Sequence, residues 1–210
     1  MNIPVKVRKR PVELATIAVV LFDDFETLDA MGPIEVFGCQ KECQLRFISR
    51  EGGIIRSYQG VKVITEQAEG INIDALLVPG GMGTRVLTTE TAYLDWLRDL
   101  VARSRLCMSV CTGSALLASA STLNGIRATS NKQAFDWVAS LNGQVQWQSQ
   151  ARWVHDGKFY TSSGISAGVD MALQVVADIY GQKRAEETAT KMEYLWNKEA
   201  NNDPFSLSQR

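Results

Sequence analysis

The sequence is poor in the features that mark several large classes of protein. Among its 210 residues there is one histidine, His155, and the formal net charge is −1. A balance so close to zero gives no basis for a nucleic-acid partner, and the short basic tract at residues 6–10 is interpreted as part of a polar leader over residues 1–13. No apolar run approaches the roughly 18 residues that a membrane span requires, and the run at residues 17–22 is too short for a signal peptide. We therefore expect a cytoplasmic protein that binds no membrane.

The four cysteines support neither a disulfide framework nor a metal site. Cys39 and Cys43 form one pair at a spacing of four, and Cys107 and Cys111 form another. Disulfides are rare in the cytosol. Cys107 and Cys111 are separated by a predicted strand and its exit, which is too far for one zinc ion. We expect no metal, and we assign no role to Cys39 and Cys43.

The remaining sequence alternates apolar runs with helical patterns. Its hydrophobic content of 45% and charged content of 21% are those of an ordinary globular protein. Continuous apolar runs predict strands that are buried on both faces, and amphipathic segments between them predict helices. The predicted strands include residues 14–22, 44–49, 75–78, 106–110 and 159–162, and the predicted helices include 91–103, 113–120, 133–141, 169–180 and 184–198.

This alternation predicts an α/β fold with a mostly parallel sheet and helices on both faces. We expect one domain over residues 1–210, with a loose tail at residues 199–210. A further helix is expected to open at Gly32–Pro33, which would place Asp29 just before it. Ligands in such folds bind at the carboxyl ends of the strands, and so the residues at those ends are the candidate site.

The stretch at residues 106–121, LCMSVCTGSALLASAS, carries the strongest functional signal. A buried strand ends at Val110, and a helix of small residues begins at Gly113, with Cys111 at the turn. Such a turn projects its side chain away from the sheet while the following N–H groups point back toward it, which is the geometry of a nucleophile elbow. The helix N-terminus is expected to lower the pKa of Cys111. The alternative is that Cys111 is a small buried apolar residue.

Two other segments are predicted to meet Cys111 at the same edge of the sheet. Asp29 follows the first strand, and Gly80 and Gly81 follow another strand in a loop that matches neither a dinucleotide fingerprint nor a phosphate-binding loop. Asp29 is either a helix cap or a general acid and base for the cysteine. The backbone N–H groups of Gly81 and Thr112 are candidates to stabilise developing negative charge.

His155 lies in an Asp-Gly turn, where a polar residue needs no catalytic reason, and so a Cys–His hydrolase is poorly supported. A site that combines a cysteine, a carboxyl group and backbone N–H donors instead favours the addition of water to a small unsaturated carbon group.

Five motifs, in this order, resemble the ThiJ/PfpI superfamily over roughly residues 14–195. They are Leu28-Asp29-x-x-Gly32-Pro33, Val78-Pro79-Gly80-Gly81-x-Gly83, Ser109-Val110-Cys111-Thr112-Gly113-Ser114, Arg127-Ala128-Thr129 and Gly164-Ile165-x-Ala167-Gly168-Val169-Asp170. The Val-Cys-Thr-Gly elbow, with Leu-Asp ahead of Gly-Pro, is most similar to the isonitrile hydratase branch of this superfamily, whose fold is like that of class I glutamine amidotransferases.

The resemblance implies a flavodoxin-like three-layer α/β sandwich that forms a homodimer. It implies hydration of a small-molecule isocyanide to an N-substituted formamide, without a metal or an organic cofactor. Cys111 would attack the terminal carbon to form a thioimidate, Asp29 would manage the proton and the water, and Thr112 would contribute its N–H group. Gly80, Gly81 and Gly113 would form the substrate and oxyanion pocket.

One departure and one alternative keep the substrate and the function open. Asn131 stands where the hydratases of this branch carry histidine, and so the pocket near that loop differs. The branch that acts on glyoxals has a glutamate and a histidine near its cysteine, whereas this chain has Asp29 and Thr112. The alternative function is a redox or stress sensor in which Cys111 is oxidised. Related regulators add a helix-turn-helix domain, for which too few residues follow Val169.

Overall fold

The computed structural model describes residues 14–206 of the chain, and the predicted leader at residues 1–13 lies outside the described residues, as do residues 207–210. Within the described part, six strands form the central sheet in the order β2-β1-β5-β6-β10-β9. The sheet is built from β1 (Thr16–Val20), β2 (Gln44–Ile48), β5 (Ala75–Val78), β6 (Leu106–Val110), β9 (Trp153–Asp156) and β10 (Phe159–Ser162). All neighbouring pairs are parallel except β10 with β9.

When only the five parallel strands are numbered, in chain order, they lie across the sheet in the order 2-1-3-4-5, which is the flavodoxin-like order. Every residue of β5 and β6 is buried, as continuous apolar runs predict for strands that are covered on both faces. Two small sheets lie beside the central one: β3 (Gly53–Arg56) with β4 (Lys62–Thr65), and β7 (Arg127–Ala128) with β8 (Gln146–Trp147).

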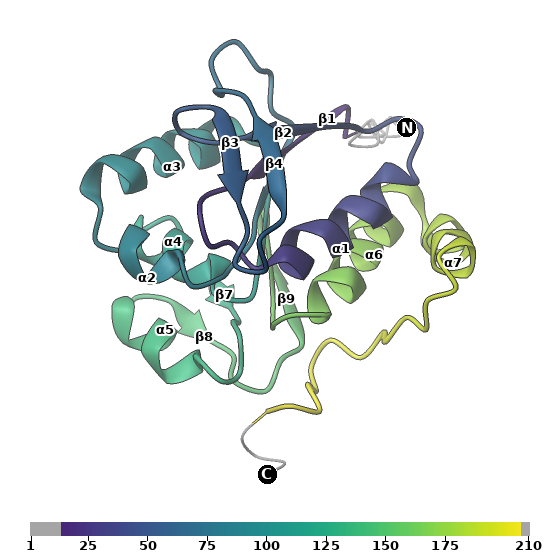
Figure 1. Cartoon of the computed structure of the whole chain (residues 1–210). Helices are drawn as coiled ribbons and strands as arrows, with labels where there is room; N and C mark the ends of the chain where they lie inside the picture. Colours follow the sequence, from purple (N-terminus) through teal and green to yellow (C-terminus); the bar gives the residue numbers. More distant parts are fainter. Residues whose placement is uncertain (1–13, 207–210) are drawn as a thin grey trace, which may run out of the picture.

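Helices cover both faces of the sheet (Figure 1). One face carries α1 (Thr27–Gly38) and α6 (Ala167–Tyr180), with α7 (Gln182–Lys191) packed against α6. The other side carries α2 (Thr84–Leu87), α3 (Thr91–Arg103), α4 (Gly113–Ser119) and α5 (Phe135–Leu141). The predicted three-layer α/β architecture is therefore confirmed. No helix among residues 14–206 is long and apolar enough to cross a membrane.

Two helix boundaries differ from the sequence-based expectation. Helix α1 begins at Thr27 rather than at Gly32–Pro33, because the first N–H group of the helix donates to Oε1 of Gln59, which lies on a distant turn. Asp29 is consequently in the first helical turn and not before the helix. Helix α7 ends at Lys191 rather than Lys198, because Glu193 has a φ of 50° and so closes the helix in the left-handed conformation.

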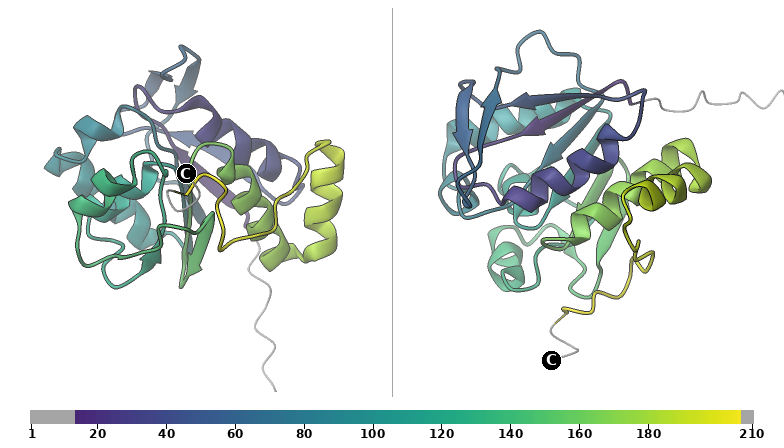
Figure 2. Two further views of the ribbon diagram at one scale, coloured as in Figure 1. Left: turned by 90° about the horizontal axis from the view of Figure 1, so that it is seen from below. Right: turned by 45° about the vertical axis from the view of Figure 1, so that its right-hand side comes forward.

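The C-terminal segment is not loose over residues 199–206. The N–H group of Arg152 donates to the Ala200 carbonyl at 2.7 Å, and the N–H group of Asp203 donates to the Gln150 carbonyl at 2.7 Å. Figure 2 shows this segment, in yellow, returning from α7 toward the rest of the molecule. The predicted tail is therefore wrong for these residues, and its last part, residues 207–210, lies outside the described chain.

A buried ion pair holds the same region together. The Arg152 guanidinium, immediately before β9, contacts Asp170 on α6 at 2.6 Å and lies 3.7 Å from Asp203 in the C-terminal segment. Asp170 also accepts hydrogen bonds from the Tyr194 hydroxyl and the Asn197 N–H group. Because a buried charge is stable only when it is paired, these contacts fix the segment against the sheet.

Candidate active site

Cys111 occupies a strained turn between β6 and α4. Its φ is 57°, which is uncommon for a residue other than glycine and costs backbone strain. The surrounding hydrogen bonds hold this conformation: the Cys111 N–H group donates to the Ser162 carbonyl at 3.1 Å, and the hydroxyl groups of Ser114 and Ser130 donate to the Cys111 carbonyl. The predicted nucleophile elbow is present in the structure.

Asp29 is the carboxyl group that faces this thiol. Its side chain is buried, and Oδ2 accepts a hydrogen bond from the Gly80 N–H group at 3.0 Å. Oδ1 is buried without a hydrogen-bond partner among the described residues. Burial raises the pKa of Asp29 to about 8, against the lowering effect of the Gly80 N–H group. Asp29 is therefore a protonated acid at neutral pH, with one carboxyl oxygen available for proton transfer.

The thiol of Cys111 keeps its proton too. Burial raises its pKa well above the ordinary value, and the Asp29 carboxylate, once ionised, acts in the same direction. Hydrogen bonds from the Thr112 N–H group and the Asn131 amide oppose this effect. The Thr112 N–H group at the N-terminus of α4 lowers this pKa as expected, but the net direction is upward, because only 6% of Cys111 is exposed and the removal of water outweighs that effect.

Asn131 contacts the sulfur directly, which sequence reasoning did not foresee. Its Nδ2 donates to Sγ of Cys111 at 3.2 Å, and its Oδ1 accepts from the N–H groups of Gln133 and Ala134. These two bonds orient the amide so that its donor faces the thiol. Gly164 lies against the same pair, since a Cβ there would be 2.4 Å from Nδ2 and 2.8 Å from Sγ. The available signal was that Asn131 stands where the hydratases of the resembling branch carry histidine.

The predicted glycine donors have other partners. The Gly81 N–H group donates to Oγ1 of Thr112 at 3.0 Å, and the Gly80 N–H group is bound by Asp29. Gly81 is therefore not a free donor for developing charge, contrary to expectation. Gly113 has a packing role, because a Cβ at this position would lie 2.2 Å from the Val78 carbonyl. Of the proposed donors, the Thr112 N–H group is the one that reaches the sulfur.

A cavity of about 390 Å³ opens in front of Cys111. Its wall combines the sulfur and Thr112 with the loop after β5, the turn before α1 and the loop after β7. The lining residues are Glu26, Tyr58, Gly81, Met82, Arg85, Cys111, Thr112, Asn131, Gln133, Ala134 and Ile165. Arg85 stacks on the Trp137 ring at 3.5 Å, so its charge is held at the rim. A small molecule can therefore reach the thiol.

His155 lies away from this site. It is on β9 at the edge of the sheet, where its ring stacks on Tyr160 at 3.9 Å. Tyr160 pairs with Met108, three residues before Cys111, which corresponds to about 10 Å along the strand. His155 is therefore not placed to act as a base for the thiol. The four cysteines are free, and residues 14–206 contain no group of three or more His, Cys, Asp or Glu side chains that could hold a metal ion.

The family model for the DJ-1/PfpI family matches residues 15–178. The chain belongs to the DJ-1/PfpI family. Its similarity to the isonitrile hydratase of Pseudomonas putida is 32% identity over 180 residues, which cover 85% of this chain and 78% of that protein. It is also 30% identical over 145 residues to the HTH-type transcriptional regulator CdhR of Pseudomonas aeruginosa, but this match covers only 42% of the regulator.

Solved structures of the DJ-1/PfpI family share the fold. The crystal structure of a ThiJ/PfpI family protein from Pseudomonas syringae superimposes with a TM-score of 0.79 at 26% identity, covering 92% of this chain and 81% of that one. The crystal structure of Drosophila melanogaster DJ-1beta gives a TM-score of 0.75 at 18% identity. The resemblance inferred from the five motifs and the flavodoxin-like fold are both confirmed.

Replacing Asn131 by alanine in this DJ-1/PfpI protein tests the hydrogen bond to the sulfur. Asn131→Ala removes a donor to Sγ, so the pKa of Cys111 rises further. Because a hydrogen bond to a charged group contributes about 1.5 kcal/mol, alkylation of Cys111 by iodoacetamide at pH 8 should slow about tenfold. Asn124→Ala, at a surface asparagine that accepts a bond from Asn142, is the matched control. Equal alkylation rates in the two variants would contradict the assignment.

The buried carboxyl makes folding depend on pH. Because burial raises the pKa of Asp29 from 3.8 to about 8, the folded chain binds more protons than the unfolded chain between these values, and stability falls as pH rises. Asp29→Asn removes this effect. The free energy of unfolding of the variant minus that of the parent protein should be larger at pH 8 than at pH 5, by on the order of 3 kcal/mol. Urea titrations of both proteins at the two pH values measure this difference, and a difference that is the same at both pH values would refute the prediction.

Proposed function

We propose that this protein is an isonitrile hydratase, which adds water to an isocyanide to form an N-substituted formamide. The observation that carries the proposal is a protonated Asp29 beside the Cys111 thiol at the end of a small cavity. An isocyanide carbon must gain both a nucleophile and a proton, and this pair supplies both. The similarity to the Pseudomonas putida isonitrile hydratase supports the same reaction.

In the first step, Sγ of Cys111 forms a bond to the terminal carbon of the isocyanide. The lone pair of that carbon takes a proton from Asp29, and the carboxyl group recovers a proton from the thiol. The product is the thioimidate R–N=CH–S–Cys111, and Asp29 ends the step protonated, as it began. Oδ1 of Asp29 is buried without a hydrogen-bond partner among the described residues, which supports its use in this exchange.

In the second step, water adds to the thioimidate carbon. Asp29 takes a proton from the water and delivers one to the nitrogen. The C–S bond then breaks, and its electron pair returns to sulfur, where the Thr112 N–H group and the Asn131 amide stabilise the developing anion. Reprotonation of sulfur by the oxygen-bound proton releases R–NH–CHO. The sum is one isocyanide plus one water, with no change of oxidation state that requires a redox cofactor.

Turnover of p-nitrophenyl isocyanide, followed by the absorbance of the formamide, tests this function. The wild-type protein should be active and Cys111→Ala inert. Asp29→Asn should lose at least about 100-fold in kcat/KM, the range for removal of a general acid. His155→Ala, whose ring lies on the far side of β10, should stay within threefold. A wild-type protein without turnover whose Cys111 gains oxygen in peroxide, detected by intact mass, would favour redox sensing instead.

We also propose that the protein is a cytoplasmic homodimer. The hairpin of β3 and β4 exposes 66% of Ile54 and 80% of Ile64, and exposed apolar side chains that gather on one element are typical of an interface. Sedimentation equilibrium should give twice the chain mass of 23.2 kDa. The double variant Ile54→Lys, Ile64→Lys should sediment as a monomer, and a wild-type monomer would contradict this proposal.

A further inference from the structure

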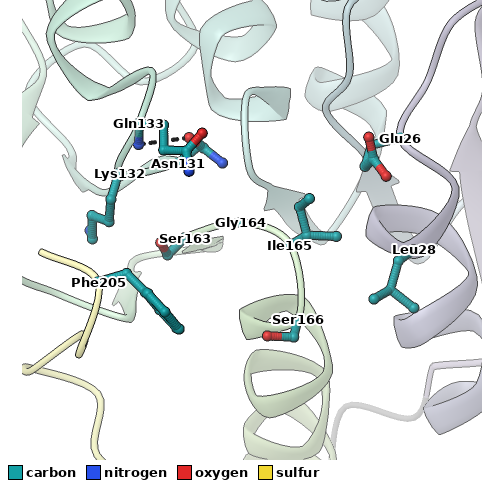
Figure 3. A pocket seen from close by; sticks show the side chains of 10 residues that line it. All are labelled: Glu26, Leu28, Asn131, Lys132, Gln133, Ser163, Gly164, Ile165, Ser166 and Phe205. Carbon is teal, nitrogen blue, oxygen red and sulfur yellow. Dashed lines mark hydrogen bonds between the residues drawn. The ribbon is translucent and has the colours of Figure 1, made fainter. Parts of the chain in front are cut away.

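A second cavity, of about 460 Å³, adjoins the one that contains Cys111. The two cavities share four wall residues, which are Glu26, Asn131, Gln133 and Ile165. The second cavity extends from these residues to the start of α6 and to Phe205 in the C-terminal segment (Figure 3). A molecule whose reactive end lies at the sulfur can therefore extend past the shared residues into the second cavity.

Three large apolar side chains from distant parts of the sequence line this second cavity. Leu28 comes from α1, Ile165 from the turn before α6, and Phe205 from the C-terminal segment (Figure 3). They are 45%, 39% and 57% exposed. Covering apolar surface gains roughly 25 cal/mol per Å², and small-molecule sites are typically concave and lined in this way. The lining favours an apolar occupant.

The charged groups of the second cavity are already bound by the protein. Nζ of Lys132 donates to Oγ1 of Thr129 and to the Ala151 carbonyl, so its ammonium group is turned toward the interior. Oε1 of Glu26 accepts from Nε2 of Gln59 at 2.7 Å. The Lys132 ammonium group is therefore not offered to an anionic occupant, and so an uncharged apolar group fits this cavity better than an anion.

Phe205 is fixed where it lines the cavity. Its N–H group donates to Oδ1 of Asp203 at 2.9 Å, and Asp203 is completely buried beside Arg152. These contacts fix the backbone at Phe205, from which the ring extends to the wall of the cavity.

We propose that the second cavity binds the N-substituent of the substrate, and that this substituent is an uncharged aryl or alkyl group too large for the cysteine cavity alone. This inference rests on the proposed hydratase function. The group R–N≡C is linear at nitrogen, so a substituent continues away from the sulfur when the terminal carbon contacts Sγ. Contacts with Phe205 and Leu28 then contribute to binding of long substrates and leave compact ones unaffected.

The test compares 2-naphthyl isocyanide with tert-butyl isocyanide, which is short enough to stay near Cys111. Phe205→Ala should raise KM for the naphthyl substrate about tenfold with little change in kcat, and should leave kcat/KM for the tert-butyl substrate within twofold. Leu28→Ala should act in the same direction. Leu195→Ala is the matched control, since Leu195 is 95% exposed in the same C-terminal region and does not line either cavity.

The outcomes separate this inference from the hydratase proposal. Turnover of neither substrate by the wild-type protein would refute the hydratase function itself. Turnover of both, with equal effects of Phe205→Ala on the two substrates, would refute the second cavity as the substituent site. If Phe205→Ala leaves selectivity unchanged but alters sedimentation, the apolar residues are covered by a second copy of the chain, and the inference is wrong.

Discussion

The chemistry of this site depends on the burial of Asp29 against Cys111 at one edge of the sheet. The segments that follow β1, β5 and β6 meet there because these three strands are adjacent and parallel. Their loops bring a carboxyl group, a backbone donor at Gly80 and a thiol into a space with little access to water. Since water is removed from both acids, both hold their protons, and Asp29 stays protonated at a pH where an exposed aspartate is ionised.

Much of the fold follows from local sequence. The strands at residues 75–78 and 106–110 and the helix at 91–103 have the predicted bounds, because continuous apolar runs and helical spacing are properties of the segments themselves. The start of α1 could not be predicted in this way, because Gln59 caps it from a distant turn. The order of the C-terminal segment could not be predicted for a similar reason. Its polar sequence suggests a loose tail, whereas Arg152 and Asp170 hold it by contacts that only the folded chain makes.

The sequence predicts which residues form the candidate site, but it does not predict the hydrogen bonds that they make. Cys111 and Asp29 could be identified because each follows a strand at the same edge of the sheet. Whether an N–H group is free cannot be read from sequence, and the Gly81 N–H group is bound by Thr112 in the structure. The net direction of the Cys111 pKa could not be predicted for a related reason. A helix N-terminus is visible in sequence, but the loss of water around a side chain depends on every segment that covers it.

Asn131 shows how these separate features combine. Its Oδ1 is held by two backbone N–H groups, and so its Nδ2 has one direction left, toward the sulfur. An amide does not titrate, so this donor is present at every pH at which the protein is folded. A histidine at the same position would lose or gain a proton near neutrality and would compete with Asp29 for that role. With an amide there, the hydratase mechanism we propose leaves the exchange of protons next to the thiol to Asp29, while Asn131 would stabilise charge on sulfur without taking part in the exchange.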